Sequence, residues 1–279
     1  MLKIIISPAK KMNLIEEYPC EPTTPVFLDR ALDLHERLKK MTLAELTTLW
    51  GCSDKLAAQN HERLHTYSPE HALSPALLSY EGIQYQHIAP GVFTDAQWNY
   101  VHSHLRILSG FYGILAPTDT VVPYRLEMQA KLKTENDVDL YGYWGNALYE
   151  ELVRDGMTEL VNLASGEYSK AILPYIKVAP APSRNGSQTH DSSPSSETCP
   201  PCIPCITCIF GELVNDKVKM KGTQAKIARG EMVRWMAEKG IEKAEDIREF
   251  KELGYRFRSD LSSPEEYVFL LTPKTKALH

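Results

Sequence analysis

Hydrophobic residues recur along the chain at two spacings, and each spacing predicts one type of element. Continuous apolar runs predict buried strands at 3–7, 159–164, 171–178, 206–214, 217–222 and 267–272. Apolar stripes at i, i+3, i+4 and i+7 predict helices at 28–40, 95–109 and 225–239. Because the two types do not alternate regularly, we expect an α+β fold in which helices cover a mixed, curved sheet.

A second helical pattern, at 43–65, predicts two helices joined by a tight turn. Gly51 is expected to end the first helix, and the Ser-Asp pair two residues later to cap the second. Lys55 and Arg63 then lie near the two ends of the second helix. The outline is similar to a helix-hairpin-helix element, whose turn amides bind a DNA phosphate. That element usually has two glycines and only Gly51 is present, so a plain helical hairpin is an equal alternative.

The segment 179–204 breaks the pattern, because it holds six Pro, six Ser and one Gly among 26 residues. Such a composition buries too little apolar surface to offset the entropy of ordering the chain. We therefore predict a single domain over 1–272, interrupted by a disordered insert at 179–204 and followed by a tail at 273–279.

Composition narrows the classes of protein that fit. The 279 residues are 43% hydrophobic and 24% charged, with a formal net charge of -5. A nucleic-acid role would therefore need a local basic face on an acidic body. The N-terminal apolar run is too short for a signal peptide, and no run approaches the roughly 20 residues of a membrane span. We expect a cytoplasmic protein.

Four of the six cysteines are spaced as C-x2-C-x2-C-x2-C at Cys199, Cys202, Cys205 and Cys208. Four thiolates at this density could hold zinc or an iron–sulfur cluster. Structural zinc sites, however, normally divide their ligands into two separated pairs, and the last cysteine falls in an expected strand. The cysteines are weak metal candidates, and no cofactor is predicted.

The first strand ends in Ser7-Pro8-Ala9 and is followed by two adjacent lysines, Lys10 and Lys11. Segments that follow buried strands often contact ligands. The alternative is a solvated turn with two surface lysines.

Two arginines lie within apolar surroundings. Arg125 is flanked by Tyr124 and Glu127 in "PYRLEM", and a charged residue in such a run needs a partner because an unpaired buried charge is costly. That partner is either a ligand or, in a structural ion pair, Glu127. Arg106 lies in "LRILSGFYGIL", where Gly110 either permits a close backbone approach or ends a helix.

The stretch "NLASGEY" follows an expected strand and offers the polar side chains of Asn162, Ser165 and Tyr168. These groups could hydrogen-bond a ligand in a cleft, or they could form an ordinary polar turn.

The strongest local charge signal is at 216–234, where six basic residues outnumber two acidic ones. Lys226 and Arg229 are three residues apart and share a face near the start of a predicted helix, where backbone N–H groups also favour anions. Phosphate binding is one explanation of this run, and a solvated charged face is the other.

Several motifs occur in a fixed order: "LKIIISPAKKMN", "SDKLAAQN", "HLRILSGFYGIL", "PYRLEM", "DLYGYWGN", "NLASGEY" and "KIARGEMVRW". As a set they resemble the YaaA family of bacterial peroxide-stress proteins over roughly 1–178 and 203–272. The resemblance implies a cytoplasmic protein that limits free iron, and so iron-driven oxidative damage. It also implies DNA binding through a positively charged cleft with a helix-hairpin-helix-like element.

Three functions follow as hypotheses. The first is sequence-nonspecific DNA binding, with phosphate contacts inferred at Lys10, Lys11, Lys55, Arg63, Arg106, Arg125, Lys226 and Arg229. The second is an enzyme on damaged DNA or a nucleotide, with Lys10 as nucleophile and Glu127 as acid or base. The third is an iron-handling protein.

Overall fold

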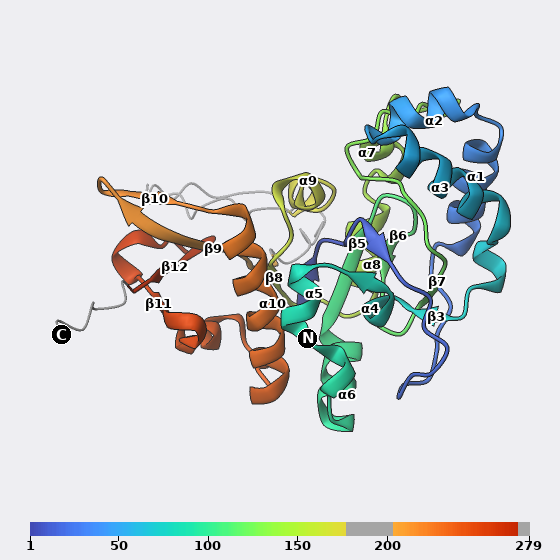
Figure 1. The fold of residues 1–279 in the computed structure, drawn as a ribbon. Coiled ribbons are helices and arrows are strands. Elements are labelled where there is room, and N and C mark those ends of the chain that lie inside the picture. Colours follow the sequence, from blue (N-terminus) through green and yellow to red (C-terminus); the bar gives the residue numbers. More distant parts are fainter. Residues whose placement is uncertain (177–202, 273–279) are drawn as a thin grey trace, which may run out of the picture.

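Five of the six apolar runs of the sequence form strands of one sheet (Figure 1). The computed structural model describes residues 1–176 and 203–272, so the predicted tail and all but two residues of the predicted insert lie outside it. Within the described residues the sheet has eight strands, and the central five are parallel. In sheet order these are β5 (Leu105–Ser109), β1 (Leu2–Ile6), β8 (Glu159–Asn162), β9 (Cys205–Val214) and β12 (Glu266–Leu271).

Antiparallel strands complete the sheet and make it mixed, as predicted. β6 (Gly113–Leu115) pairs with β5 and β11 (Tyr255–Phe257) with β12, while β10 (Lys217–Lys219) forms a hairpin with β9. Two short pairs lie apart from the sheet: β2 (Lys11–Met12) with β4 (Tyr80–Glu81), and β3 (Ser74–Pro75) with β7 (Thr120–Val121).

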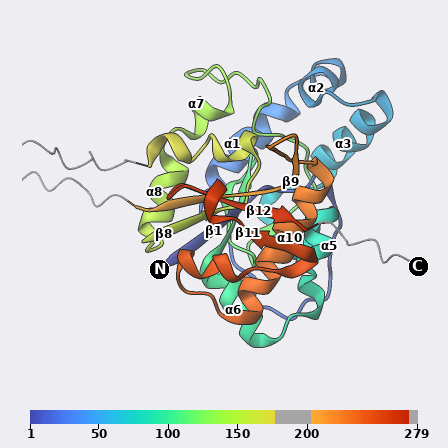
Figure 2. The ribbon, with the colours of Figure 1, turned by 90° about the vertical axis from the view of Figure 1, so that its left-hand side faces the viewer.

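Helices cover both faces of the sheet, which is why every residue of β1 is buried. On one face lie α5 (Ile83–Ile88), α6 (Asp95–His104) and α10 (Gly222–Lys239), and α8 (Ala147–Arg154) lies on the other (Figure 2). α5 and α10 approach closely because Gly230 has no side chain; a Cβ there would lie 2.2 Å from the Gln84 carbonyl oxygen. The helices and the sheet share one hydrophobic core, which confirms the α+β class.

A second group of helices lies beyond the β6 edge of the sheet and contains the predicted helical hairpin. It comprises α1 (Leu28–Lys39), α2 (Leu43–Trp50), α3 (Asp54–Thr66) and α7 (Leu140–Trp144) (Figure 1). Gly51 ends α2 in the left-handed conformation, as expected. Ser53 occupies the N-cap position of α3, but its side chain makes no capping bond.

The remaining helices are short. Two are α-helical turns, α4 (Ala76–Ser79) and α9 (Gly166–Ser169). The 3₁₀ helices span Pro69–His71, Pro90–Val92, Leu173–Tyr175, Ala244–Glu249, Glu252–Gly254 and Ser259–Leu261.

The predicted helix at 95–109 is wrong in its second half. α6 ends at His104, and the chain continues directly as β5, which pairs in parallel with β1. The apolar residues Leu105, Ile107 and Leu108 fit both a helical stripe and a buried strand, and the tertiary pairing with β1 decided between them. Arg106 therefore lies on a strand.

The predicted strand at 171–178 is also wrong over its described part. Residues Leu173–Tyr175 form a 3₁₀ helix instead. Pro174 has no N–H to donate to a ladder and fixes a φ angle that suits the first turn of a helix. The last two residues of the predicted strand lie outside the described residues.

Candidate functional site

The parallel strands direct several polar segments to one edge of the sheet. β1 ends at Ile6, β8 at Asn162 and β5 at Ser109, and the segments that follow meet at this carboxyl edge. In open sheets with parallel strands, ligands bind in the crevice outside the carboxyl ends.

A cavity of about 480 Å³ lies at this edge, and we call it the inner cavity. It brings together nine residues predicted from sequence: Lys10, Lys11, Tyr124, Arg125, Glu127, Ser165, Tyr168, Lys226 and Arg229. These residues come from four segments that are far apart in the chain.

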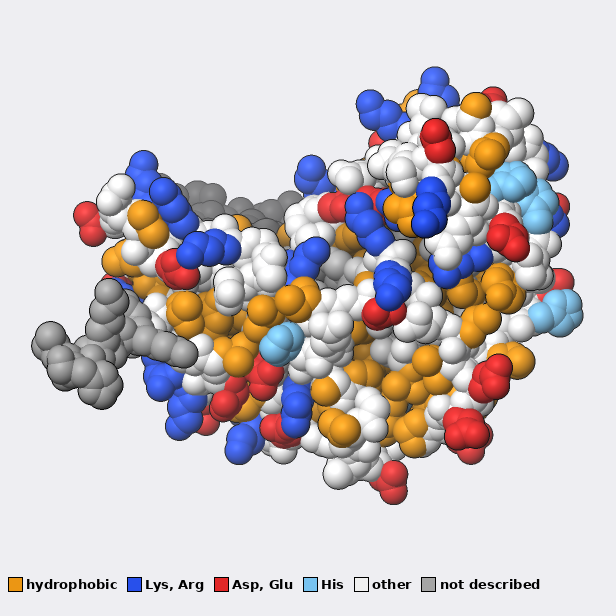
Figure 3. Space-filling view, in the orientation of Figure 1, with side chains coloured by type: hydrophobic (Ala, Val, Ile, Leu, Met, Phe, Trp, Pro, Cys, Tyr) orange, Lys and Arg blue, Asp and Glu red, His pale blue; other side chains and the backbone are white. Residues whose placement is uncertain are grey.

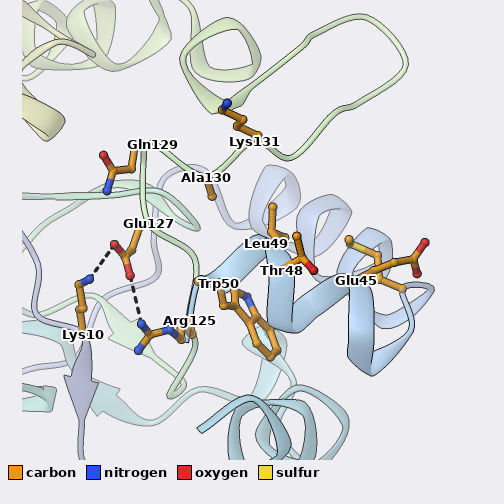
Figure 4. Close-up of a pocket in the computed structure, with 12 residues that line it drawn as sticks. Lys10, Glu45, Thr48, Leu49, Trp50, Arg125, Glu127, Gln129, Ala130 and Lys131 are labelled. Carbon is orange, nitrogen blue, oxygen red and sulfur yellow. Dashed lines mark hydrogen bonds and ion pairs between the residues drawn. The ribbon is translucent and has the colours of Figure 1, made fainter. Parts of the chain in front are cut away.

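Glu127 lines the inner cavity and is the centre of an ion-pair network with Lys10 and Arg125 (Figure 4). Its carboxylate lies 2.8 Å from Lys10 Nζ and 3.3 Å from a terminal nitrogen of Arg125. The structural ion pair considered for Arg125 therefore exists. The Arg125 side chain is only 11% exposed, and its Nε is buried without a hydrogen-bond partner among the described residues. The Nε–H of Arg125 is therefore a buried hydrogen-bond donor with no acceptor among the described residues.

A second hollow, of about 680 Å³, adjoins the first and shares Lys10, Arg125 and Glu127 with it. We call it the outer hollow; it extends over α2 to Gly51 and to Lys131. The two hollows form what we call the basic groove. Lys and Arg side chains follow the same face from the β10 lobe across its centre toward α2 (Figure 3).

Gly110 positions the loop that carries Arg125 and Glu127. A Cβ at this glycine would lie 2.6 Å from the Leu126 carbonyl oxygen and 2.9 Å from the Met128 nitrogen. The close-approach role considered for Gly110 is therefore confirmed, because only glycine lets this loop pack on the end of β5.

α10 contributes Lys226, which is exposed, and Arg229, which is half-buried. Within residues 1–176 and 203–272, Arg229 has no ion-pair partner, and its Nε is buried without a hydrogen bond. Burial lowers the pKa of this guanidinium, since desolvation disfavours the charged form. Arg229 is thus a cation whose charge is not compensated by a carboxylate.

Sequence reasoning left Glu167 out of its predicted site residues. Its side chain lines the inner cavity and accepts a hydrogen bond from the Gln129 backbone nitrogen. Burial raises the pKa of this carboxyl, and the nearby charge of Glu127 adds to the shift. The sequence placed Glu167 in a polar turn, with no local sign that it would face a second carboxylate from another segment.

Buried tyrosines form the floor of the cavity. The Tyr124 hydroxyl lies 2.7 Å from the hydroxyls of both Tyr80 and Ser109, and burial raises the pKa of Tyr124 to about 12. Burial likewise raises the pKa of Tyr168 well above its ordinary value. These phenols are therefore neutral hydrogen-bonding groups at neutral pH. Ser165 is held by Ser7, whose Oγ accepts a bond from the Ser165 nitrogen at 2.8 Å.

Four predicted residues do not line either hollow. Arg106 lies at the opposite, amino edge of the sheet, where it pairs with Asp155. Asn162 is buried, and its amide donates to the hydroxyl of Thr207 at 3.2 Å. Lys55 and Arg63 lie on α3, behind the helix that borders the outer hollow.

The cysteine motif is only partly described, because Cys199 and Cys202 lie outside the described residues. Cys205 and Cys208 are on β9, three residues apart, so their side chains face opposite sides of the sheet. Burial raises the pKa of Cys205 to about 12 and raises that of Cys208 as well. In the described part of the chain, no group of three or more His, Cys, Asp or Glu side chains is arranged to hold a metal ion.

A search of the described helices for a membrane-spanning segment found none that is both long and apolar enough.

The fold and the groove together define a class: an α+β protein whose basic residues converge at the carboxyl edge of a largely parallel sheet. Comparison with known sequences specifies the family. The family model described as "Peroxide stress protein YaaA" matches residues 2–261, and the chain belongs to this family. The resemblance inferred from the motifs is therefore confirmed.

Relatives of similar length support the assignment. The chain is 45% identical to a UPF0246 protein of Desulfitobacterium hafniense (strain Y51) over 269 residues, which covers 96% of this chain and 98% of the relative. It is 44% identical to a UPF0246 protein of Pediococcus pentosaceus over 269 residues, with the same coverage. Membership supports a role in peroxide stress.

Proposed function

We propose that this protein acts during peroxide stress by binding DNA in the cytoplasm through the basic groove, without strong sequence preference. One observation carries the proposal. Five basic side chains from distant segments converge on one cavity in a chain of net charge -5. Such local concentration on an acidic body is the electrostatic footprint of a polyanion site.

The ion pairs already present in the groove do not oppose this function. The side chains of Lys10 and Lys11 are 65% and 68% exposed, so their pairs with Glu127 and Glu81 are solvated. Exposed pairs contribute little net energy, and a lysine can exchange its carboxylate for a phosphate at small cost. Release of counterions from the DNA then favours the exchange.

The helical hairpin lies at one end of the groove in this proposal. Gly51, in the turn between α2 and α3, lines the outer hollow, whereas Lys226 lines the inner cavity and not the outer hollow. A DNA strand along the groove would meet the hairpin amides first and α10 last. Lys55 and Arg63 would contact phosphates only if the strand continued past the turn.

The test is fluorescence anisotropy with a labelled duplex over a series of salt concentrations. If each of the five basic residues of the inner cavity contacts one phosphate, log K falls with log salt at a slope of about -4.5. Lys10→Ala and Arg125→Ala each make the slope shallower by about one and weaken binding. Arg234→Ala is the matched control, because Arg234 lies on α10 but pairs with Glu238 away from the groove. Absence of duplex binding by the wild type at low salt would refute the proposal.

The hairpin is tested separately by Lys55→Gln. Weaker binding in this variant supports a hairpin contact with DNA, whereas unchanged binding confines the interface to the two hollows.

An enzyme on damaged DNA or a nucleotide is a second candidate, favoured by two carboxylates in one cavity. Glu127 is held by two cations, whereas burial raises the pKa of Glu167, an arrangement that suits a base and an acid. Lys10, the proposed nucleophile, is exposed and ion-paired, so it lacks the desolvation that activates lysines.

The test of catalysis is trapping by borohydride on DNA that contains an abasic site. The Lys10 amine would add to the sugar aldehyde and lose water, and borohydride would reduce the resulting imine to a stable cross-link. A cross-link that disappears in Lys10→Ala supports the enzyme; its absence in the wild type counts against it.

Limitation of iron-driven damage is the cellular consequence that we propose for DNA binding. Cells carrying the double variant Lys10→Ala, Arg125→Ala should survive peroxide less well than cells with the wild type. Full survival with a protein that no longer binds DNA would instead favour direct iron handling.

A further inference from the structure

We infer that the inner cavity binds a phosphate monoester dianion, with Arg229 as its principal ligand. The inference rests on the proposed function and deepens it, because it names a chemical group that the groove would select. The monoester could be the terminal phosphate of a DNA strand or a free mononucleotide, and the experiment below distinguishes these sources.

Arg229 is the first observation. A guanidinium that is largely withdrawn from water costs free energy unless an anion pairs with it. Among the described residues no carboxylate does so, and the one charge that opposes the lowering of its pKa is that of the Cys208 thiol. That thiol is itself kept protonated by burial, so it supplies no negative charge. The described residues therefore supply no partner for Arg229, and its donors face the inner cavity, where an external anion could bind.

The charge of the cavity is the second observation. Five basic and three acidic side chains line it, which leaves a net charge of +2. Two of the acids are already paired: Glu127 with Lys10 and Arg125, and Glu81 with Lys11. The third is Glu167, whose raised pKa reflects the cost of keeping it charged there.

Arg229 and Lys226 are the cavity's two cations without a carboxylate partner among the described residues. A phosphate monoester carries about -1.5 to -2 charge at pH 7 and three terminal acceptor oxygens, whereas an internal phosphodiester carries one negative charge. A guanidinium can hold two of these oxygens through its planar donor fork.

Size is the third observation. The cavity volume of about 480 Å³ lies within the range of small-molecule sites, roughly 300–1,000 Å³. That volume accommodates one nucleotide. Tyr85 and Gln84, which are both buried, also line the cavity beside the basic residues. Because oxidative cleavage of deoxyribose leaves strand ends with terminal phosphates, a monoester site also suits a peroxide-stress protein.

The first experiment is isothermal titration calorimetry with inorganic phosphate, 2′-deoxyadenosine 5′-monophosphate and 2′-deoxyadenosine. The wild type should bind the two phosphates and not the nucleoside. Arg229→Gln should bind the monophosphate about tenfold or more weakly, because it loses a charge-assisted hydrogen-bonding pair. Arg234→Gln, which removes one charge from the same helix outside the cavity, should bind as the wild type does.

Stability separates a ligand-binding role of Arg229 from a structural one. Without ligand, the Arg229→Gln variant should have the melting temperature of the wild type or a higher one, because the substitution removes an uncompensated charge. Added phosphate should raise the melting temperature of the wild type but not that of Arg229→Gln. If Arg229→Gln does not fold, Lys226→Gln replaces it, since Lys226 is exposed. Equal monophosphate binding by wild type and both variants, or none by the wild type, overturns the inference.

The source of the monoester is identified with nicked duplexes that end in a 3′-phosphate or a 3′-hydroxyl at the nick. Tighter binding of the phosphorylated nick, lost in Arg229→Gln, identifies the strand end as the ligand. Arg229-dependent monophosphate binding without duplex binding identifies a mononucleotide and refutes the DNA proposal alone. Salt-dependent duplex binding without monophosphate binding refutes the monoester inference alone.

Discussion

The two edges of the sheet differ in whether the protein supplies partners for their basic side chains. At the amino edge, Lys3 is fully buried, and its Nζ lies 2.7 Å from Asp155 and donates at 2.7 Å to the Ser103 carbonyl. Arg106 pairs with the same aspartate and donates to the His102 carbonyl at 2.8 Å. At the carboxyl edge, Arg229 and the Nε of Arg125 lack such partners among the described residues.

The difference separates structural cations from cations available to a ligand. At the amino edge the protein itself satisfies each buried charge, so those residues contribute to stability and have no capacity for an external anion. At the carboxyl edge the cations face a cavity, and Arg229 has no carboxylate partner among the described residues. Burial alone therefore does not identify a functional arginine; the absence of an internal partner beside a cavity does.

The largest expected effect is at the amino edge. Asp155→Ala leaves Lys3 buried without its counter-ion, and removing one partner of a buried pair costs about 3–5 kcal/mol. Urea denaturation measures the loss. Asp260→Ala, which breaks an exposed pair with Arg258, should change stability little. A small effect of Asp155→Ala would contradict the structural role assigned to this edge.

Gly110→Ala should affect both stability and the carboxyl edge. The new methyl group would displace the loop that carries Arg125 and Glu127, at a cost of about 1–3 kcal/mol. DNA binding should weaken with it. Gly222→Ala, where a Cβ meets no atom within 4 Å, is the matched control for chain entropy. Full DNA affinity in folded Gly110→Ala would show that the loop position does not matter for binding.

Glu127→Gln should strengthen anion binding. It removes one negative charge and releases Lys10 and Arg125, so DNA affinity at low salt should rise roughly fivefold. The same titration with Glu238→Gln, which releases Arg234 outside the groove, should show no comparable gain. Weaker binding by Glu127→Gln would mean that Glu127 holds the two cations in place.

The smallest effect concerns Glu167. Burial raises the pKa of Glu167 in the folded state above the ordinary 4.5. At pH values between 4.5 and that raised pKa, the folded state binds more protons than the unfolded state. Stability therefore falls as pH rises through that interval, and charged Glu167 is unfavourable at neutral pH. Glu167→Gln should raise the melting temperature modestly at pH 7 and not at pH 4. An equal change at both pH values would exclude the titration of Glu167 as the cause.

Most elements of the sheet could be predicted from local pattern, because short continuous apolar runs such as 3–7 and 267–272 are typical of strands buried on both faces. Prediction failed where two periodicities overlap. In 95–109 the apolar residues satisfy a helix throughout, and only pairing with β1 makes the last five a strand. The strand predicted at 171–178 was wrong because the prediction gave more weight to the apolar residues of that segment than to the missing backbone N–H of Pro174.

The candidate site shows a similar division. Nine residues of the inner cavity were predicted because charged and polar side chains at strand ends, or within apolar runs, need partners. Arg106 was predicted for the same reason, because it is a charged residue within an apolar run, but it lies at the amino edge of the sheet. It is near the amino end of β5, and from there its side chain cannot reach the carboxyl edge. Glu167 was omitted because its significance depends on Glu127, 40 positions earlier in the sequence.

The sequence by itself determined the family, the main helices and strands, and the stock of basic and acidic side chains. Each of these depends on residue types and spacings within short segments. Only the tertiary structure decided which cations are neutralised. Lys10 meets Glu127, and Lys3 meets Asp155, across more than a hundred residues of chain, so both pairings depend on strand order and helix packing rather than on local spacing.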